Sequence, residues 1–125
     1  MSILVIAEHD NANLKGATLN TVAAAKEIGS DITLLVAGSD IASVISEAQQ
    51  LNGITKILNC DNDLYKNSLA EELSNLVVSL ASSFSFILAP ATTFGKNLLP
   101  RVSAKLDVQQ ISDIISIESE DTFKR

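Results

Sequence analysis

This chain is poor in the residue types on which most catalytic and metal sites depend. It has one cysteine, Cys60, and one histidine, His9. A single cysteine cannot form an internal disulfide, and no His or Cys cluster at metal-ligand spacing accompanies it, so a reducing compartment fits. The carboxylate of the adjacent Asp61 disfavours the thiolate of Cys60, which we interpret as a packed residue at a strand end. With one histidine, no Ser/His/Asp or Cys/His arrangement can be proposed.

Basic residues and long apolar runs are also scarce. Nine Lys and Arg against 15 Asp and Glu give a net charge of -6 and a pI near 4.6. Such a charge repels nucleic acid and anionic membrane surfaces. No apolar run approaches the ~20 residues that span a bilayer, and the N-terminus shows no targeting signal. We therefore expect a cytoplasmic protein with no nucleic-acid partner and no membrane insertion.

What is present indicates one α/β domain over residues 1–125, because 46% of the residues are hydrophobic and the chain is too short for two ordinary domains. Short continuous apolar runs predict strands that are buried on both faces. Spacing of i, i+3, i+4, i+7 between these runs predicts helices. The predicted strands are Ile3–Ala7, Ile32–Val36, Ile54–Leu58, Phe86–Ala89 and Ile114–Ile117. The predicted helices cover 18–28, 41–51 and 69–80, and a last helix runs through 98–101 and starts at Phe94 or near Asn97.

Several residues mark the ends of these helices. Ser68 with Glu71 three residues later is typical of a capping box. Asp40 or Ser39 is expected to cap the second helix, and Gly29 stands where the first should stop. The start of the last helix stays open, because Pro100 is harmless only in a first helical turn.

Strict alternation of strands and helices predicts a doubly wound, Rossmann-like parallel sheet of five strands in the order 3-2-1-4-5. The topological switch then lies between the first and fourth strands. Ligands of open α/β sheets bind at such a point, so function is expected first in the loops Glu8–Ala17 and Pro90–Lys96.

The fifth predicted strand has no helix after it. The residues from Glu118 to Arg125 are mostly polar. An apolar strand near a sheet edge needs a covering layer. We therefore expect a domain that continues into a longer protein or docks on a partner.

Acidic residues follow the first predicted strand, where a metal or acid/base site could lie. Glu8, His9 and Asp10 are adjacent, so their side chains point in different directions, and a solvated loop is the favoured interpretation. Glu8 and Asp10, together with Asp61 after the third strand and Thr92 after the fourth, also resemble the site of a phosphoacceptor receiver domain. That site needs a lysine after the fifth strand, and none stands there.

A nucleotide-binding module is the stronger alternative. Thr92, Thr93 and the backbone at Gly95 could donate to a phosphate at a helix start. The loop has a single glycine and no Walker or G-x-G-x-x-G pattern, so the phosphate site is poorly supported. We expect Thr93 to cap the helix, and Lys96 and Arg101 to form ion pairs.

Four segments carry a family resemblance. They are Ile3–His9, Leu14–Gly29 (LKGATLNTVAAAKEIG), Val36–Ser39 (VAGS) and Ile87–Ile114 (ILAPATTFGKNLLPRVSAKLDVQQISDI). Together they resemble the N-terminal domain of the electron transfer flavoprotein alpha subunit, which is adenine nucleotide hydrolase-like in fold, over nearly the whole chain.

The resemblance implies a heterodimer with a beta subunit that carries electrons on FAD. The donors are acyl-CoA dehydrogenases of fatty acid beta-oxidation and related enzymes, and the acceptor is a quinone oxidoreductase. In that family a separate C-terminal domain of the alpha subunit holds FAD, and AMP belongs to the beta subunit. The resemblance therefore assigns no catalytic, cofactor-binding or metal residue to this chain, which serves as scaffold and beta-subunit interface.

Overall fold

Strands and helices alternate along the whole described part of the chain. The computed structural model describes residues 2–10, 12–65, 70–84, 86–90, 92–106 and 114–117. The elements are β1 (Ser2–Ile6), α1 (Gly16–Ile28), β2 (Asp31–Gly38), α2 (Ala42–Gln49), β3 (Lys56–Asp61), the 3-10 turn η1 (Asp63–Tyr65), α3 (Ala70–Leu80), the 3-10 turn η2 (Ala81–Ser83), β4 (Phe86–Pro90), α4 (Thr93–Leu106) and β5 (Ile114–Ile117).

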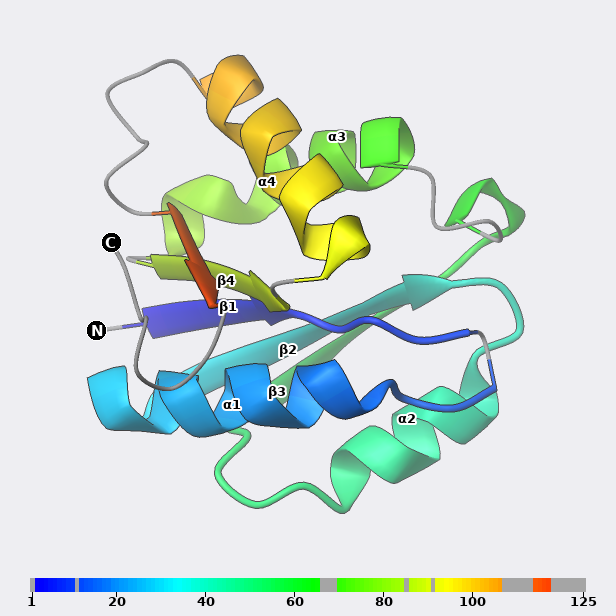
Figure 1. The fold of residues 1–125 in the computed structure, drawn as a ribbon. Coiled ribbons are helices and arrows are strands. Elements are labelled where there is room, and N and C mark those ends of the chain that lie inside the picture. Colours follow the sequence, from blue (N-terminus) through cyan, green and yellow to red (C-terminus); the bar gives the residue numbers. More distant parts are fainter. Residues whose placement is uncertain are drawn as a thin grey trace.

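The strands form one parallel sheet in the order β3-β2-β1-β4-β5 (Figure 1). The α/β class, the parallel pairing and the order of the first four strands confirm the prediction. At the far edge, β5 pairs with β4 so that Ile114 lies opposite Ile87. The side chains of β5 and the residues after it lie outside the described part of the chain, so the predicted cover for this strand stays a prediction.

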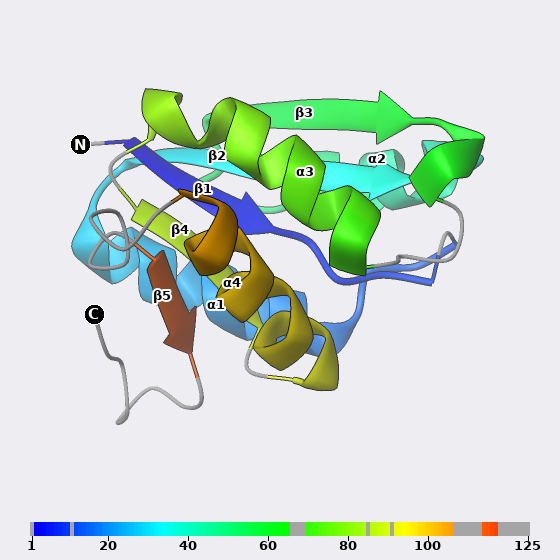
Figure 2. The ribbon, with the colours of Figure 1, turned by 90° about the horizontal axis from the view of Figure 1, so that it is seen from above.

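Helices cover both faces of the sheet, α1 and α2 on one side and α3 and α4 on the other (Figure 2). The central strand β1 contributes to two separate cores: Ile3 and Val5 face α1 and α2, whereas Leu4 and Ile6 face the other pair. All four side chains are at most 1% exposed. Burial on both faces explains why the strand reads as a continuous apolar run.

β3 begins at Lys56, two residues later than the apolar run predicted. Thr55 explains the shift, because its hydroxyl donates to the Ser30 carbonyl at 3.0 Å and accepts from the Ile32 amide at 3.2 Å. These bonds make Thr55 the entry to the strand. Ile54 packs against the core just before it.

The prediction that Asp40 or Ser39 caps α2 is wrong. The residue before the helix is Ile41, and no side chain at that position closes the helix end. Asp61, at the end of β3, instead accepts from the amides of Asp40 at 2.8 Å and Ile41 at 3.2 Å. Asp40 itself adopts a positive φ of 58°, which turns the chain into the helix.

α4 begins at Thr93 and holds Pro100 inside it. Because proline has no N–H, the carbonyl of Lys96 receives no helical hydrogen bond from position 100. Gly29 closes α1 as predicted, with its amide donating to the Ala25 carbonyl at 3.1 Å. Ser68 of the predicted capping box lies outside the described residues.

Candidate functional site

The two loops predicted to meet at the topological switch do meet. Glu8 follows β1 and Thr92 follows β4, and the Thr92 hydroxyl donates to Oε1 of Glu8 at 2.8 Å. The loops leave neighbouring strands toward opposite faces of the sheet, β1 toward α1 and β4 toward α4 (Figures 1 and 2). The hydrogen bond therefore joins the two loops at the point where an open α/β sheet usually binds its ligand.

The backbone of Glu8 is held by α1. The Thr18 hydroxyl accepts from the Glu8 amide at 2.8 Å and donates to the Glu8 carbonyl at 3.0 Å, and Thr18 is fully buried. The Lys15 amide donates to the same carbonyl at 2.8 Å. Both backbone groups of Glu8 are thus bound to the first turn of α1, which fixes where its carboxylate can lie.

The rest of this loop is held by its own turn and by α2. Oδ1 of Asp10 accepts from the Ala12 and Asn13 amides at 3.0 and 2.7 Å. These two bonds lower the pKa of the Asp10 carboxyl. The Leu14 amide donates to Oε1 of Glu47 at 2.7 Å. These three amides of the loop are therefore bound inside the protein.

His9 is buried, so the prediction of a solvated loop is wrong for this residue. Its side chain is 8% exposed, and Nε2 donates to the Ala37 carbonyl at 2.7 Å, at the end of β2. Burial lowers the pKa of His9, and the Ala37 carbonyl and the neighbouring acids oppose this shift. Glu8, His9 and Asp10 point toward α4, β2 and solvent respectively, so they form no joint site.

Gly95 has a structural role at the start of α4. A Cβ at this position would lie 1.8 Å from the Pro90 carbonyl oxygen, so only glycine lets the helix approach the end of β4 this closely. The Lys96 amide donates to the Thr92 carbonyl at 2.8 Å. Thr93 is the exposed first residue of the helix, so the prediction that it is the cap is wrong.

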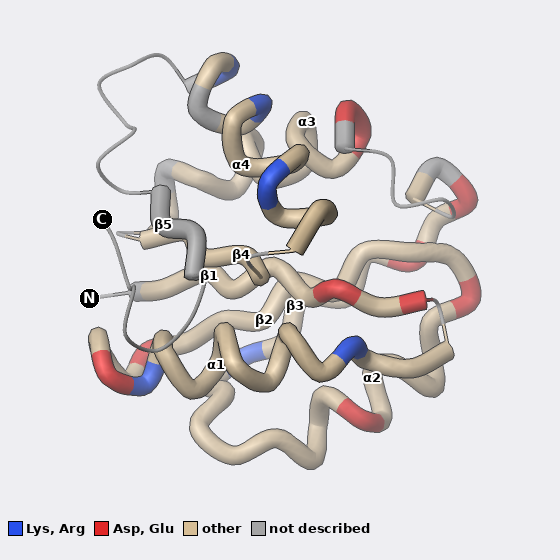
Figure 3. Tube along the Cα trace, viewed as in Figure 1, with Lys and Arg blue, Asp and Glu red and all other residues tan. Residues whose placement is uncertain are grey.

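The predicted ion pair of Arg101 is confirmed. Glu71 of α3 binds Arg101 at 3.1 Å and Lys105 at 2.7 Å. Figure 3 shows basic positions along α4 and acidic positions at the start of α3. The hydrogen bond and charge of Lys105, with Arg101, lower the pKa of Glu71. Lys96 is exposed and makes no ion pair within the described part of the chain, so its predicted pair is not found there.

The receiver interpretation is wrong. A receiver-type sheet has the order 2-1-3-4-5, which places the third strand beside the first. Here β2 separates β3 from β1, so Asp61 and Glu8 are about 10 Å apart by strand spacing alone. Asp61 is already bound to the start of α2. Within the described residues no group of three or more His, Cys, Asp or Glu is placed to hold a metal ion.

Cys60 lies half-buried on β3. Burial raises the pKa of its thiol, in agreement with its interpretation as a packed strand residue.

The residues at the switch do not fit a nucleotide phosphate. A phosphate at the start of α4 would lie beside the carboxylate of Glu8, which Thr92 holds there.

The sequence did not reveal the roles of Thr18 and Glu47, which position the loop after β1. A buried threonine on an otherwise alanine-rich helix face was a usable signal for Thr18, whereas nothing in the sequence pointed to Glu47.

Comparison with known proteins decides the family. Residues 3–125 match the electron transfer flavoprotein domain. The chain belongs to the electron transfer flavoprotein family. Its resemblance to that family is therefore confirmed over nearly its whole length.

Three curated relatives, all called electron transfer flavoprotein subunit alpha, illustrate the similarity. Identity is 56% to the protein of Pseudomonas aeruginosa, over 100% of this chain and 40% of the relative. Identity is 43% to the protein of Paracoccus denitrificans, over 100% of this chain and 41% of the relative. Identity is also 43% to the mitochondrial protein of Dictyostelium discoideum, over 98% of this chain and 37% of the relative. The chain thus spans about two fifths of the length of these relatives.

Two grooves of this electron transfer flavoprotein domain lie beside β3. One of about 410 Å³ and one of about 300 Å³ flank the start of β3. The switch itself does not fit the phosphates of FAD any better than those of a mononucleotide, because the same carboxylate would face them. In the described part of the chain, no helix is both long and apolar enough to span a membrane.

Proposed function

We propose that residues 1–125 are the N-terminal domain of an electron transfer flavoprotein alpha subunit and act there as scaffold and beta-subunit interface. The family match over residues 3–125 and the alpha-subunit names of the relatives support this assignment. The observation that carries the scaffold role is the Glu8–Thr92 hydrogen bond, which joins the two switch loops and holds a carboxylate at the usual ligand position of this fold.

In this proposal the full protein is an electron carrier and not a catalyst. It accepts electrons from acyl-CoA dehydrogenases and related enzymes on FAD and passes them to a quinone oxidoreductase. FAD is held by another part of the alpha subunit, and AMP by the beta subunit. The domain is cytoplasmic in a bacterial host and contributes no catalytic residue of its own.

The proposal is tested by mixing the 125-residue chain with FAD and, separately, with the beta subunit. We expect FAD fluorescence to stay unchanged during titration, because the switch loops offer a carboxylate where flavin phosphates would bind. We expect the beta subunit to bind the chain in analytical ultracentrifugation. Saturable quenching of FAD fluorescence would refute the scaffold role. If the beta subunit bound neither this chain nor the full alpha subunit, the assignment to an electron transfer flavoprotein alpha subunit would be refuted.

A further inference from the structure

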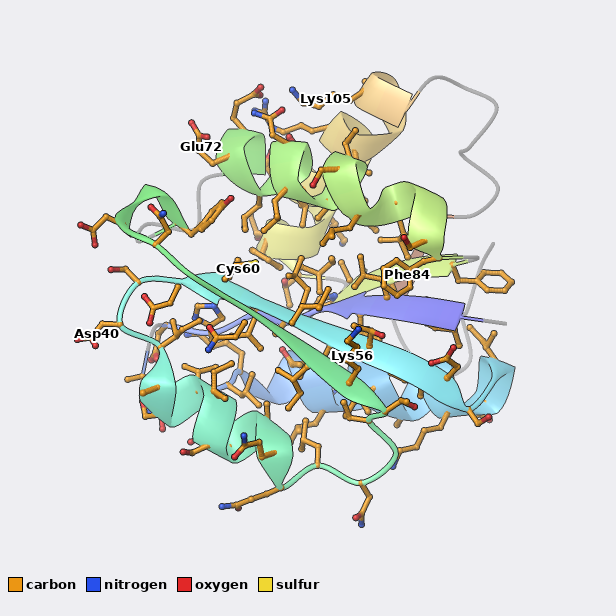
Figure 4. The ribbon with its side chains drawn as sticks, turned by 180° about the vertical axis from the view of Figure 1, so that it is seen from behind. Asp40, Lys56, Cys60, Glu72, Phe84 and Lys105 are labelled. Atoms are coloured by element: carbon orange, nitrogen blue, oxygen red, sulfur yellow. The ribbon has the colours of Figure 1, made fainter. Side chains whose placement is uncertain are left out.

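Asn52 is the one asparagine of this chain that is followed by glycine. Asn52 and Gly53 form a turn in the connection between α2 and β3, which enters the sheet at Lys56 (Figure 4). Gly53 has a positive φ of 90°, which glycine adopts without strain. The turn thus needs glycine for its shape, and this glycine leaves the backbone nitrogen beside the Asn52 side chain unhindered.

Both groups of this pair are open to reaction. Asn52 and Gly53 are exposed, and neither the Asn52 side chain nor the Gly53 amide makes a hydrogen bond to another described residue. The Gly53 nitrogen and Cγ of Asn52 are separated by the bonds that close a succinimide ring. Attack of this nitrogen on Cγ therefore needs no movement beyond the turn itself.

Lys26 of α1 lies across the turn. A Cβ added to Gly53 would contact Cε of Lys26 and would lie 3.2 Å from its Nζ. The amide nitrogen has to lose its proton before it attacks, and a nearby positive charge favours an anion. The ammonium group of Lys26 is therefore placed to promote ring closure.

We propose that Asn52 converts spontaneously to aspartate and isoaspartate, and that Lys26 promotes this conversion. Hydroxide removes the proton of the Gly53 amide, and the nitrogen forms a bond to Cγ of Asn52. The bond between Cγ and Nδ2 then breaks, and Nδ2 takes a proton from water and leaves as ammonia. Water opens the ring at Cγ to give aspartate, or at the main-chain carbonyl carbon of residue 52 to give isoaspartate. The reaction uses water alone and is independent of the proposed function.

The products change a turn that is fixed on both sides. The Leu51 amide donates to the Ala48 carbonyl at 3.1 Å, and the Thr55 amide donates to the Ile32 carbonyl at 2.7 Å. Isoaspartate lengthens the backbone between these two bonds by one atom, because the chain then runs through Cβ. Either product also places a new negative charge near Lys26.

Peptide mass spectrometry of the aged protein tests the proposal. Trypsin cleaves after Lys26 and Lys56 and releases residues 27–56, in which Asn52 is the single asparagine. One portion of the folded protein is held at mildly alkaline pH before digestion, and a second portion is digested at once. The difference between the two portions measures conversion in the folded protein, and fragmentation by electron transfer distinguishes aspartate from isoaspartate.

Asn20 is the internal control. It is exposed like Asn52, but it lies within α1, where the amide of the next residue is held in a helical hydrogen bond. We expect Asn52 to convert at least about tenfold faster than Asn20, with isoaspartate among its products. Conversion of both residues at the same rate, or of neither, would overturn the proposal.

Two variants of Lys26 test its part in the reaction. Lys26→Arg keeps the positive charge over the turn, and Lys26→Gln removes it. We expect Asn52 to convert about two- to fivefold more slowly in the glutamine variant than in the arginine variant, which is the size of a charge interaction at an exposed site. Equal rates in the two variants would contradict the role of Lys26.

Discussion

Replacing Gly95 by alanine tests whether α4 needs a residue without a side chain where it contacts the end of β4. Gly95 is buried in the first turn of α4, and an added Cβ would lie 1.8 Å from the Pro90 carbonyl oxygen and 3.5 Å from the Ala89 Cβ. Contacts under 3.0 Å essentially never occur for real Cβ atoms. The helix would therefore have to move away from β4, which is held in the sheet by β1 and β5.

Gly95→Ala has two opposing effects on the free energy of unfolding, and they differ in size. Alanine is favoured over glycine inside a helix by about 1 kcal/mol, which raises stability. Overpacking against backbone that cannot move costs about 1–3 kcal/mol and can cost more. At this separation we expect the upper end of the range, so the free energy of unfolding of Gly95→Ala should fall by about 2 kcal/mol.

Urea denaturation followed by circular dichroism measures this change, and Gly16→Ala is the matched control. Gly16 is the first residue of α1 and has no atom within 4 Å of an added Cβ. We expect this control to gain about 0.5–1 kcal/mol. A Gly95→Ala chain as stable as wild type, or more stable, would show that α4 does not need the close approach to Pro90.

Three further predictions follow from the same structure. Burial lowers the pKa of His9 below 6.5 in the folded protein, so the unfolded chain binds this proton more readily. The contribution of His9 to the free energy of unfolding should therefore be constant above pH 6.5 and fall below that pH, and the His9→Gln variant should lack this part of the fall in an acid titration. Thr18→Val leaves the Glu8 amide without its acceptor, and urea melts should show a loss of about 1–3 kcal/mol, whereas an unchanged midpoint contradicts the role of this hydroxyl. Asp61→Ala removes the acceptor at the start of α2 and should cost about 1 kcal/mol, while Asp61→Asn, which keeps one side-chain acceptor oxygen, should cost less in the same assay.

The hydrophobic pattern of the sequence was sufficient to predict the doubly wound sheet, because each strand and each helix buries its own apolar residues. The continuous run at Ile3–Ile6 predicts a strand covered on both faces, and the structure places it at the centre of the sheet. Alternation of strands and helices then limits the connections to a doubly wound sheet. The position of the switch loops follows from that order, so the sequence by itself located the place where Glu8 and Thr92 meet.

Only the tertiary structure decided how the residues at that place are used. Asp40 has the right type and position for a cap, but Asp61 from a distant strand binds the helix start, because strand pairing brings β3 to that point. The contact between Gly95 and Pro90 depends on the angle at which α4 meets β4, which no local pattern encodes. The same holds for Glu8, because its bond to Thr92 joins residues 84 positions apart and exists only once β1 and β4 lie side by side.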